Sequence, residues 1–224
     1  MIKHVSFDLW QTLIRPNPDF RIKRAKIIAE RYNIKNKTLT EIIQFIVEQD
    51  KLIDRQNETN DTKMPAIEMY EFVLRQMNVS SSRSIPEEAG FLLNTSNELF
   101  LEFPPELLNP QIPDILHSLK SKGIMLSIGS NTGFVEGNIL KKLLEKSGIL
   151  HYFSFLVFSD EIKSSKPSAR FFRQILEKSA FPQSQILHIG DNPTADYQGA
   201  IDFGFDALLI THPNYTIDDI CAKL

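Results

Sequence analysis

The sequence is poor in the features that mark secreted and membrane-spanning proteins. Its 224 residues include one cysteine, Cys221, so the chain cannot close a disulfide on itself, and nothing in it requires an oxidising compartment. The apolar runs are shorter than the roughly 18 residues that a membrane span needs. No basic-then-apolar leader precedes the first strand-like segment. We therefore expect a cytoplasmic protein with no membrane partner.

The charge also lacks a dominant sign. The 25 basic and 28 acidic side chains give a formal net charge of −3 and are interspersed along the chain. A nucleic-acid-binding surface needs a basic surplus on one face, so no nucleic-acid partner is expected. The length suits one α/β core with a modest second lobe. The sequence leaves both a monomer and a homodimer open.

Two parts of the chain differ in their hydrophobic pattern. Apolar segments typical of buried strands lie at residues 5–9, 124–128, 155–158, 186–189 and 207–210. Helical patterns separate the last four, and this alternation is typical of an α/β fold with a doubly wound, Rossmann-like parallel sheet. After the first strand the pattern is helical throughout. We predict a core domain of residues 1–15 and 105–224, and an inserted helical domain of residues 16–104.

The inserted region also contains capping and loop signals. Thr40 is the predicted N-cap of a long helix whose apolar stripe includes Ile42 and Ile46. Polar loops that separate the helices are expected at residues 57–63 and 80–84.

Residues suited to phosphate chemistry follow four of the five predicted strands. Ligands of an open parallel sheet bind outside the carboxyl ends of the strands, so these residues are expected to meet. Asp8 ends the first strand between apolar neighbours, as a nucleophilic carboxylate or a metal ligand requires. Ser130 and Asn131 follow the second strand and suit an oxyanion held at a helix N-terminus.

The other two strands contribute one base and two acids. Lys166 follows the third strand, where its cation could neutralise a phosphate and a nucleophile. Asp191 lies at the tip of the fourth strand, and Asp196 about one helical turn further on. Each residue alone fits a cap or a solvated surface position. Together, in this order and at one sheet edge, they predict an active site.

This order and spacing resemble the haloacid dehalogenase (HAD) superfamily over the whole chain, and the helical insertion resembles the family's cap. The resemblance implies that Asp8 is the nucleophile that forms an aspartyl intermediate. It also implies that Thr12 is the threonine of the first loop, that Ser130 holds phosphate with Asn131 beside it, and that Lys166 steadies both charges. The substrate would be a small phosphorylated molecule.

The resemblance further implies a magnesium site. Its protein ligands would be Asp8, the main-chain carbonyl of Trp10, and the acidic pair Asp191 and Asp196, with Asp191 preferred as the direct ligand. Magnesium favours hard oxygen ligands, which carboxylates and carbonyls supply.

Trp10 is the main departure from the family pattern. Phosphatases of the family carry a second aspartate at this position, which protonates the leaving group and then activates water, and an indole can do neither. Three interpretations stay open: a phosphatase whose acid comes from elsewhere or whose substrates leave readily, a 2-haloacid dehalogenase-like hydrolase, and a catalytically weak binding or regulatory protein. The first is preferred. Gln11 also stands where the family commonly has glycine.

Three basic residues of the inserted region and its boundary are candidate contacts for a phosphate or carboxylate of the substrate, although solvated surface positions suit them better: Arg15, Arg55 and Lys63.

Overall fold

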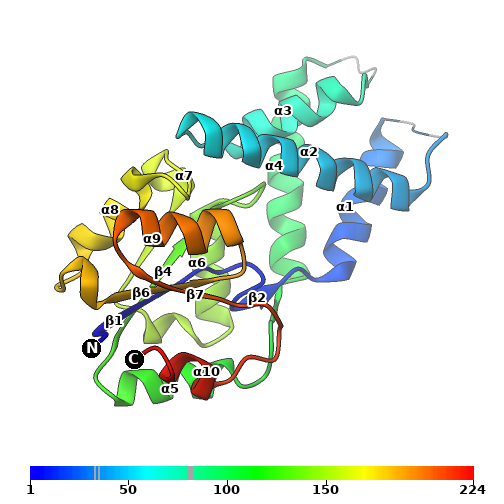
Figure 1. Cartoon of the computed structure of the whole chain (residues 1–224). Helices are drawn as coiled ribbons and strands as arrows, with labels where there is room; N and C mark the ends of the chain where they lie inside the picture. The colour runs from blue at the N-terminus through cyan, green and yellow to red at the C-terminus, as the bar shows by residue number, and fades with distance from the viewer. Residues whose placement is uncertain (33, 35, 80–82) are drawn as a thin grey trace.

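The five predicted strands form one parallel sheet (Figure 1). The structure, a computed structural model, describes residues 1–32, 34, 36–79 and 83–224. The strands are β1 (His4–Phe7), β4 (Met125–Ser130), β5 (Phe155–Phe158), β6 (Ile186–Gly190) and β7 (Asp206–Leu209). They lie in the order β5-β4-β1-β6-β7, and every pairing is parallel. The predicted α/β fold class is therefore confirmed, and the central strand is β1, whose four residues are all buried.

Helices cover both faces of the sheet. On one face, α5 (Ile112–Ser121), α6 (Gly137–Lys146) and the short α10 (Ile217–Cys221) share a hydrophobic cluster with β1 and β4. On the other face, α8 (Ala169–Lys178) and α9 (Gly199–Phe203) pack on β5, β6 and β7, and α7 (Ser159–Ile162) follows β5 directly. None of the helices within the described residues is both long and apolar enough to cross a membrane.

A helical lobe lies beyond the carboxyl ends of the strands (Figure 1). It consists of α1 (Pro18–Arg31), α2 (Leu39–Asn60), α3 (Ala66–Gln76) and α4 (Ile85–Glu102), which share a hydrophobic cluster of their own. The two segments that connect the lobe to the sheet pair as a two-stranded antiparallel ribbon, β2 (Ile14–Arg15) with β3 (Glu106–Leu107). This ribbon was not predicted from the sequence. The division into domains at residues 16 and 104 stays a prediction.

Aromatic side chains connect the lobe with the sheet. Phe134, from the loop after β4, belongs to the cluster of the lobe, with its ring centroid 4.8 Å from that of Tyr70. Phe20 and Phe100 come from the lobe but pack in the cluster of the sheet. This exchange of side chains packs α1, α3 and α4 against the part of the chain that forms the sheet.

The start of α2 corrects one prediction. The N-cap is Thr38, not Thr40, which lies inside the first turn. The Thr38 hydroxyl accepts a hydrogen bond from the Glu41 N–H at 3.2 Å, and the Glu41 carboxylate accepts one from the Thr38 N–H at 2.7 Å. This reciprocal capping box satisfies two otherwise unpaired donors, which Thr40 cannot do.

One of the two predicted loops of the lobe also differs from expectation. The first begins at Asp61 rather than residue 57, because α2 continues to Asn60. Of the second, residues 80–82 lie outside the described part of the chain.

Candidate active site

Lys166 is the centre of a buried network at the strand ends. Its ammonium donates hydrogen bonds to Asp8 Oδ1 at 2.7 Å, to Asp196 Oδ1 at 2.5 Å and to the Gly129 carbonyl at 2.7 Å. Lys166 is 1% exposed, Asp8 6% and Asp196 2%. A buried charge is tolerated only when it is paired in this way. Three predicted site residues therefore meet here, and a fourth, Asn131, is hydrogen-bonded to the main chain of Lys166.

Asn131 holds the main chain of Lys166 in place. Its side-chain oxygen accepts from the Lys166 N–H at 2.8 Å, and its amide nitrogen donates to the Lys166 carbonyl at 3.1 Å. This pair of bonds joins the loop after β4 to the loop that carries the lysine. In this structure Asn131 therefore positions the cation.

Asp196 is positioned by the turn that follows β6. The chain enters a short π-helix, η3 (Pro193–Gln198), in which the Asn192 N–H donates to Asp196 Oδ2 at 2.9 Å. A Cβ on Gly190 would lie 2.2 Å from the Asp196 carboxyl carbon, so only glycine leaves room for this carboxylate. The sequence predicted the acid but not the π-helix.

His188 adds a contact that the sequence did not predict. It is a buried residue of β6 whose Nε2 lies 3.3 Å from Asp196 Oδ1 and whose Nδ1 lies 3.2 Å from the Ser6 hydroxyl. Burial lowers the pKa of His188 more than the hydrogen bond to Asp196 raises it. A neutral imidazole with its proton on Nε2 donates to Asp196 and accepts from Ser6.

The three acids predicted as metal ligands lie together. One carboxylate oxygen from each of Asp8, Asp191 and Asp196 lies within 4.8 Å of the other two. Burial raises the pKa of Asp8 to about 7, although Lys166 opposes the shift, and burial raises that of Asp191 to about 6. Burial would also raise the pKa of Asp196, but Lys166 and the His188 hydrogen bond hold it below its ordinary range.

This set of donors fits a divalent cation. When ionised, the three carboxylates place three negative charges beside the single ammonium of Lys166, which leaves two uncompensated. Hard oxygen ligands and a deficit of two positive charges suit magnesium. The main-chain carbonyl of Trp10 stays a prediction as a further ligand.

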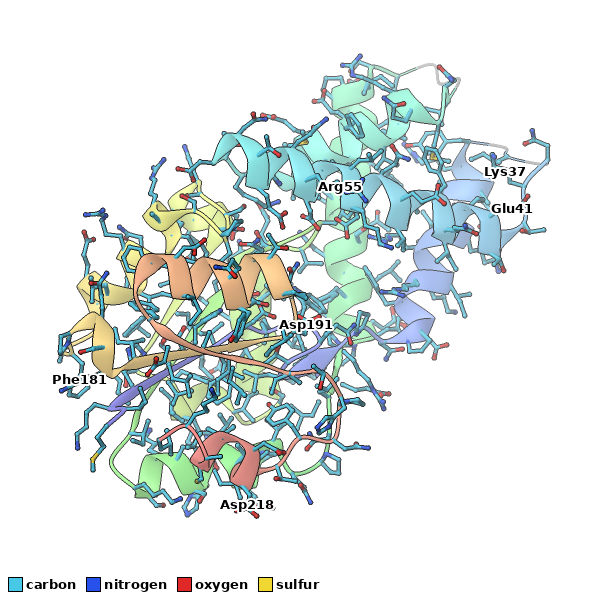
Figure 2. The ribbon with its side chains drawn as sticks, viewed as in Figure 1. Lys37, Glu41, Arg55, Phe181, Asp191 and Asp218 are labelled. Carbon is cyan, nitrogen blue, oxygen red and sulfur yellow. The ribbon has the colours of Figure 1, made fainter. Side chains whose placement is uncertain are left out.

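A cleft of about 320 Å³ opens between this network and the lobe. Figure 2 shows α2, on which Arg55 is labelled, crossing above the strand end at which Asp191 lies. The sheet side of the cleft includes Asp8, Trp10, Asn131, Lys166, Asp191 and Asp196. The lobe side is formed by Phe20, Arg21 and Arg24 of α1, Asp50, Asp54 and Glu58 of α2, and Phe100 of α4.

Trp10 forms part of an aromatic wall of the cleft. Its ring meets the ring of Phe100 edge-on, with centroids 6.1 Å apart, and Phe100 meets Phe20 at 5.4 Å. The next residue, Gln11, has a φ of 56°, a left-handed conformation that favours glycine. The wall is apolar, so position 10 contributes packing in place of a titratable group.

Two predicted phosphate-site residues lie behind the cleft rather than in its lining. The Ser130 hydroxyl donates to the Asn131 carbonyl at 3.1 Å. The Thr12 hydroxyl is buried and has no hydrogen-bond partner among the described residues, while the Thr12 carbonyl accepts from the Tyr215 hydroxyl at 3.0 Å. The catalytic roles of Thr12 and Ser130 stay predictions.

The candidate basic contacts also lie outside the cleft lining. Arg15 pairs with Glu106 on the surface at 2.8 Å, Arg55 is exposed, and the Lys63 ammonium is buried 3.2 Å from the Met69 sulfur. The arginines in the cleft are Arg21 and Arg24 instead. The sequence did not identify these two arginines as cleft residues, because tertiary packing decides which face of α1 meets the sheet.

Residues 5–210 match the family described as haloacid dehalogenase-like hydrolase, and the chain belongs to this family. The glyceraldehyde 3-phosphate phosphatase of Methanothermobacter thermautotrophicus is 29% identical over 140 residues, which are 61% of this chain and 60% of that protein. The (S)-2-haloacid dehalogenase 2 of Pseudomonas sp. is 27% identical over 110 residues, 49% of this chain and 46% of the dehalogenase. For eight of the curated relatives, the matches span 29% to 61% of the relative's own length.

A solved structure shares the fold over nearly the full length. The magnesium-bound crystal structure of YfnB from Bacillus subtilis superposes with a TM-score of 0.73 at 20% sequence identity, and the match covers 96% of this chain and 91% of YfnB. The superposition includes both the sheet and the helical lobe, since it covers almost the whole chain. At this identity the likeness concerns the fold.

Proposed function

We propose that the protein is a magnesium-dependent phosphatase that acts on a small phosphorylated molecule through an aspartyl-phosphate on Asp8. The observation that carries the proposal is the buried network in which Lys166 binds Asp8 and Asp196, with Asp191 close enough to share a cation. The phosphatase among the relatives supports it.

The residues divide the chemistry between them. Asp8 Oδ2 attacks phosphorus, because Oδ1 is held by Lys166. The Lys166 ammonium lies between Asp8 and Asp196, where it compensates the charge of the attacking carboxylate and of an incoming phosphate oxygen. Asp8, Asp191, Asp196 and the Trp10 carbonyl would hold Mg²⁺, which when bound supplies charge neutralisation and polarises the phosphoryl group. Water then attacks phosphorus and releases Asp8.

A second candidate function rests on Trp10. Halide needs no proton to leave, so a 2-haloacid dehalogenase tolerates an aromatic residue at position 10, and one relative is such an enzyme. The acidic cluster weighs against it, since the resemblance implies that the family's dehalogenases use no metal. A weak binding or regulatory protein is the third interpretation.

Parallel assays separate these functions. Phosphate release from a panel of phosphate esters with and without Mg²⁺ is measured beside halide release from 2-haloacids. We expect Mg²⁺-dependent phosphate release that Asp8→Asn abolishes. The matched control is Asp206→Asn, the same change at an exposed residue of β7, which should keep full activity. Halide release without metal would replace the phosphatase by the dehalogenase, and silence in both assays favours the binding protein.

A further inference from the structure

The lobe presents a row of carboxylates to the cleft. Asp50, Asp54 and Glu58 follow one another at intervals of four residues on α2, and all three line the cleft. Residues with this spacing lie one above the other on a single helix face. The row therefore runs along the side of α2 that faces the strand ends.

The two ends of the row can be placed over particular strands. Asp50 Oδ1 lies 3.5 Å from the position that a Cβ on Gly133 would occupy, in the loop after β4. Burial raises the pKa of Glu58, and Glu58 also lies close enough to Asp196 and Lys166 for the first charge to raise that pKa further and the second to lower it. Asp196 follows β6, so Glu58 faces that side of the sheet.

The middle of the row, Asp54, lines the same cleft as Asp8 and Trp10. Asp54 is one helical turn from Asp50 and one from Glu58, and β1 lies between β4 and β6. The end of β1 carries Asp8 and Trp10. Asp54 thus lies on the wall of the cleft opposite the nucleophile, and an ester bound to Asp8 would have its leaving group between the two walls.

Asp54 is also suited to exchange a proton near neutral pH. Burial raises its pKa to about 7, the negative charges of Asp50 and Glu58 add to the shift, and the positive charge of Lys63 opposes it. Within the described residues, no hydrogen bond or ion pair of the protein holds the Asp54 carboxyl group. General acids work best when their pKa lies close to the working pH.

We propose that Asp54 is the general acid and base of the reaction, in place of the side chain that Trp10 cannot supply. The inference rests on the proposed function. As Asp8 forms its bond to phosphorus, the bond from phosphorus to the ester oxygen breaks, and the Asp54 carboxyl transfers its proton to that oxygen. The Asp54 carboxylate then takes a proton from the water that attacks phosphorus, while the bond between phosphorus and Asp8 breaks. The net change is an ester and water converted to an alcohol and phosphate.

The dependence of rate on the leaving group tests this role. We compare Asp54→Asn with the wild type on glycerol 2-phosphate, whose alkoxide needs a proton, and on p-nitrophenyl phosphate, whose leaving group does not. We expect kcat/KM to fall by roughly 10²–10⁴-fold on the first substrate and by less than about tenfold on the second, because general acid catalysis matters only for the poor leaving group. The wild-type rate on glycerol 2-phosphate should decline above about pH 7, and this decline should be absent from Asp54→Asn.

Two further variants complete the experiment. Asp54→Glu keeps an acid on α2 and should recover part of the activity on glycerol 2-phosphate. Glu48→Gln removes a carboxylate from the exposed face of the same helix, where Glu48 accepts a hydrogen bond from Gln44. It should leave kcat/KM unchanged on both substrates. Equal losses on both substrates, or no loss, would overturn the role of Asp54 while leaving the phosphatase intact. Phosphate release that survives Asp8→Asn would instead overturn the proposed function and this inference with it.

Discussion

Replacing Gly190 by alanine tests the geometry of the site without reference to any substrate. The added Cβ would lie 2.2 Å from the Asp196 carboxyl carbon and 2.3 Å from Asp196 Oδ2, far inside contact distance. Either β6 shifts, which costs about 1–3 kcal/mol as overpacking, or Asp196 moves away from Lys166. The second response loses a hydrogen bond between charged groups, a cost of about 1.5–3 kcal/mol. Both routes predict a loss of about 1–3 kcal/mol in the free energy of unfolding.

Urea unfolding of Gly190→Ala measures this loss, and Gly90→Ala is the matched control. A Cβ on Gly90 meets nothing within 4 Å, and Gly90 lies inside α4. Alanine is a better helix former than glycine, so the control should gain up to about 1 kcal/mol. A change in Gly190→Ala of less than about 0.5 kcal/mol, the range of neutral surface substitutions, would refute the close packing of Asp196 against β6.

Two other predictions concern charge in the network. Lys166→Met leaves Asp8 and Asp196 without their shared cation and should lower the free energy of unfolding by about 3–5 kcal/mol at pH 8. This loss, measured by urea unfolding, should be smaller at pH 5, where Asp8 is protonated. An equal loss at both pH values would contradict the prediction. The pKa values of about 7 for Asp8 and about 6 for Asp191 lie above their ordinary values, so the folded, ion-free protein keeps protons that the unfolded chain has lost. The stability of the ion-free protein should therefore fall as the pH rises from about 4 to 7. The affinity for Mg²⁺ should instead rise over the upper part of that range, because carboxylates that bind the ion must be ionised. Mg²⁺ affinities from calorimetry that do not change between pH 5.5 and 7.5 would contradict the second prediction.

The grouping of the site residues at the strand ends could be predicted from the sequence, because the geometry of a parallel sheet determines it. A parallel sheet brings the residues that follow its strands to one edge, so Asp8, Lys166 and Asp196 could be expected to meet from their order alone. In the structure Lys166 donates to Asp8 at 2.7 Å and to Asp196 at 2.5 Å, while their roles in catalysis stay predictions. The strand at Phe155–Phe158 was also predicted with the bounds that the structure has.

Other features depend on packing or on segments too short to show a pattern. The ribbon of β2 and β3 has two residues per strand, which is too few for any alternation to be seen. The cleft face of α2 is polar at Asp54, and polarity alone cannot distinguish a cleft from solvent. The N-cap at Thr38 could have been found, since the spacing from Thr38 to Glu41 is that of a capping box.

The most direct test is to look for phosphate on Asp8 during turnover. The protein is mixed with Mg²⁺ and p-nitrophenyl phosphate, quenched in acid, digested, and the peptide that contains Asp8 is examined by mass spectrometry. We predict a phosphorylated peptide whose phosphate is on Asp8 and is removed by hydroxylamine, and no such peptide from Asp8→Asn. Steady release of phosphate with the Asp8 peptide unmodified, or with phosphate on another residue, would contradict the assignment of Asp8 as the nucleophile.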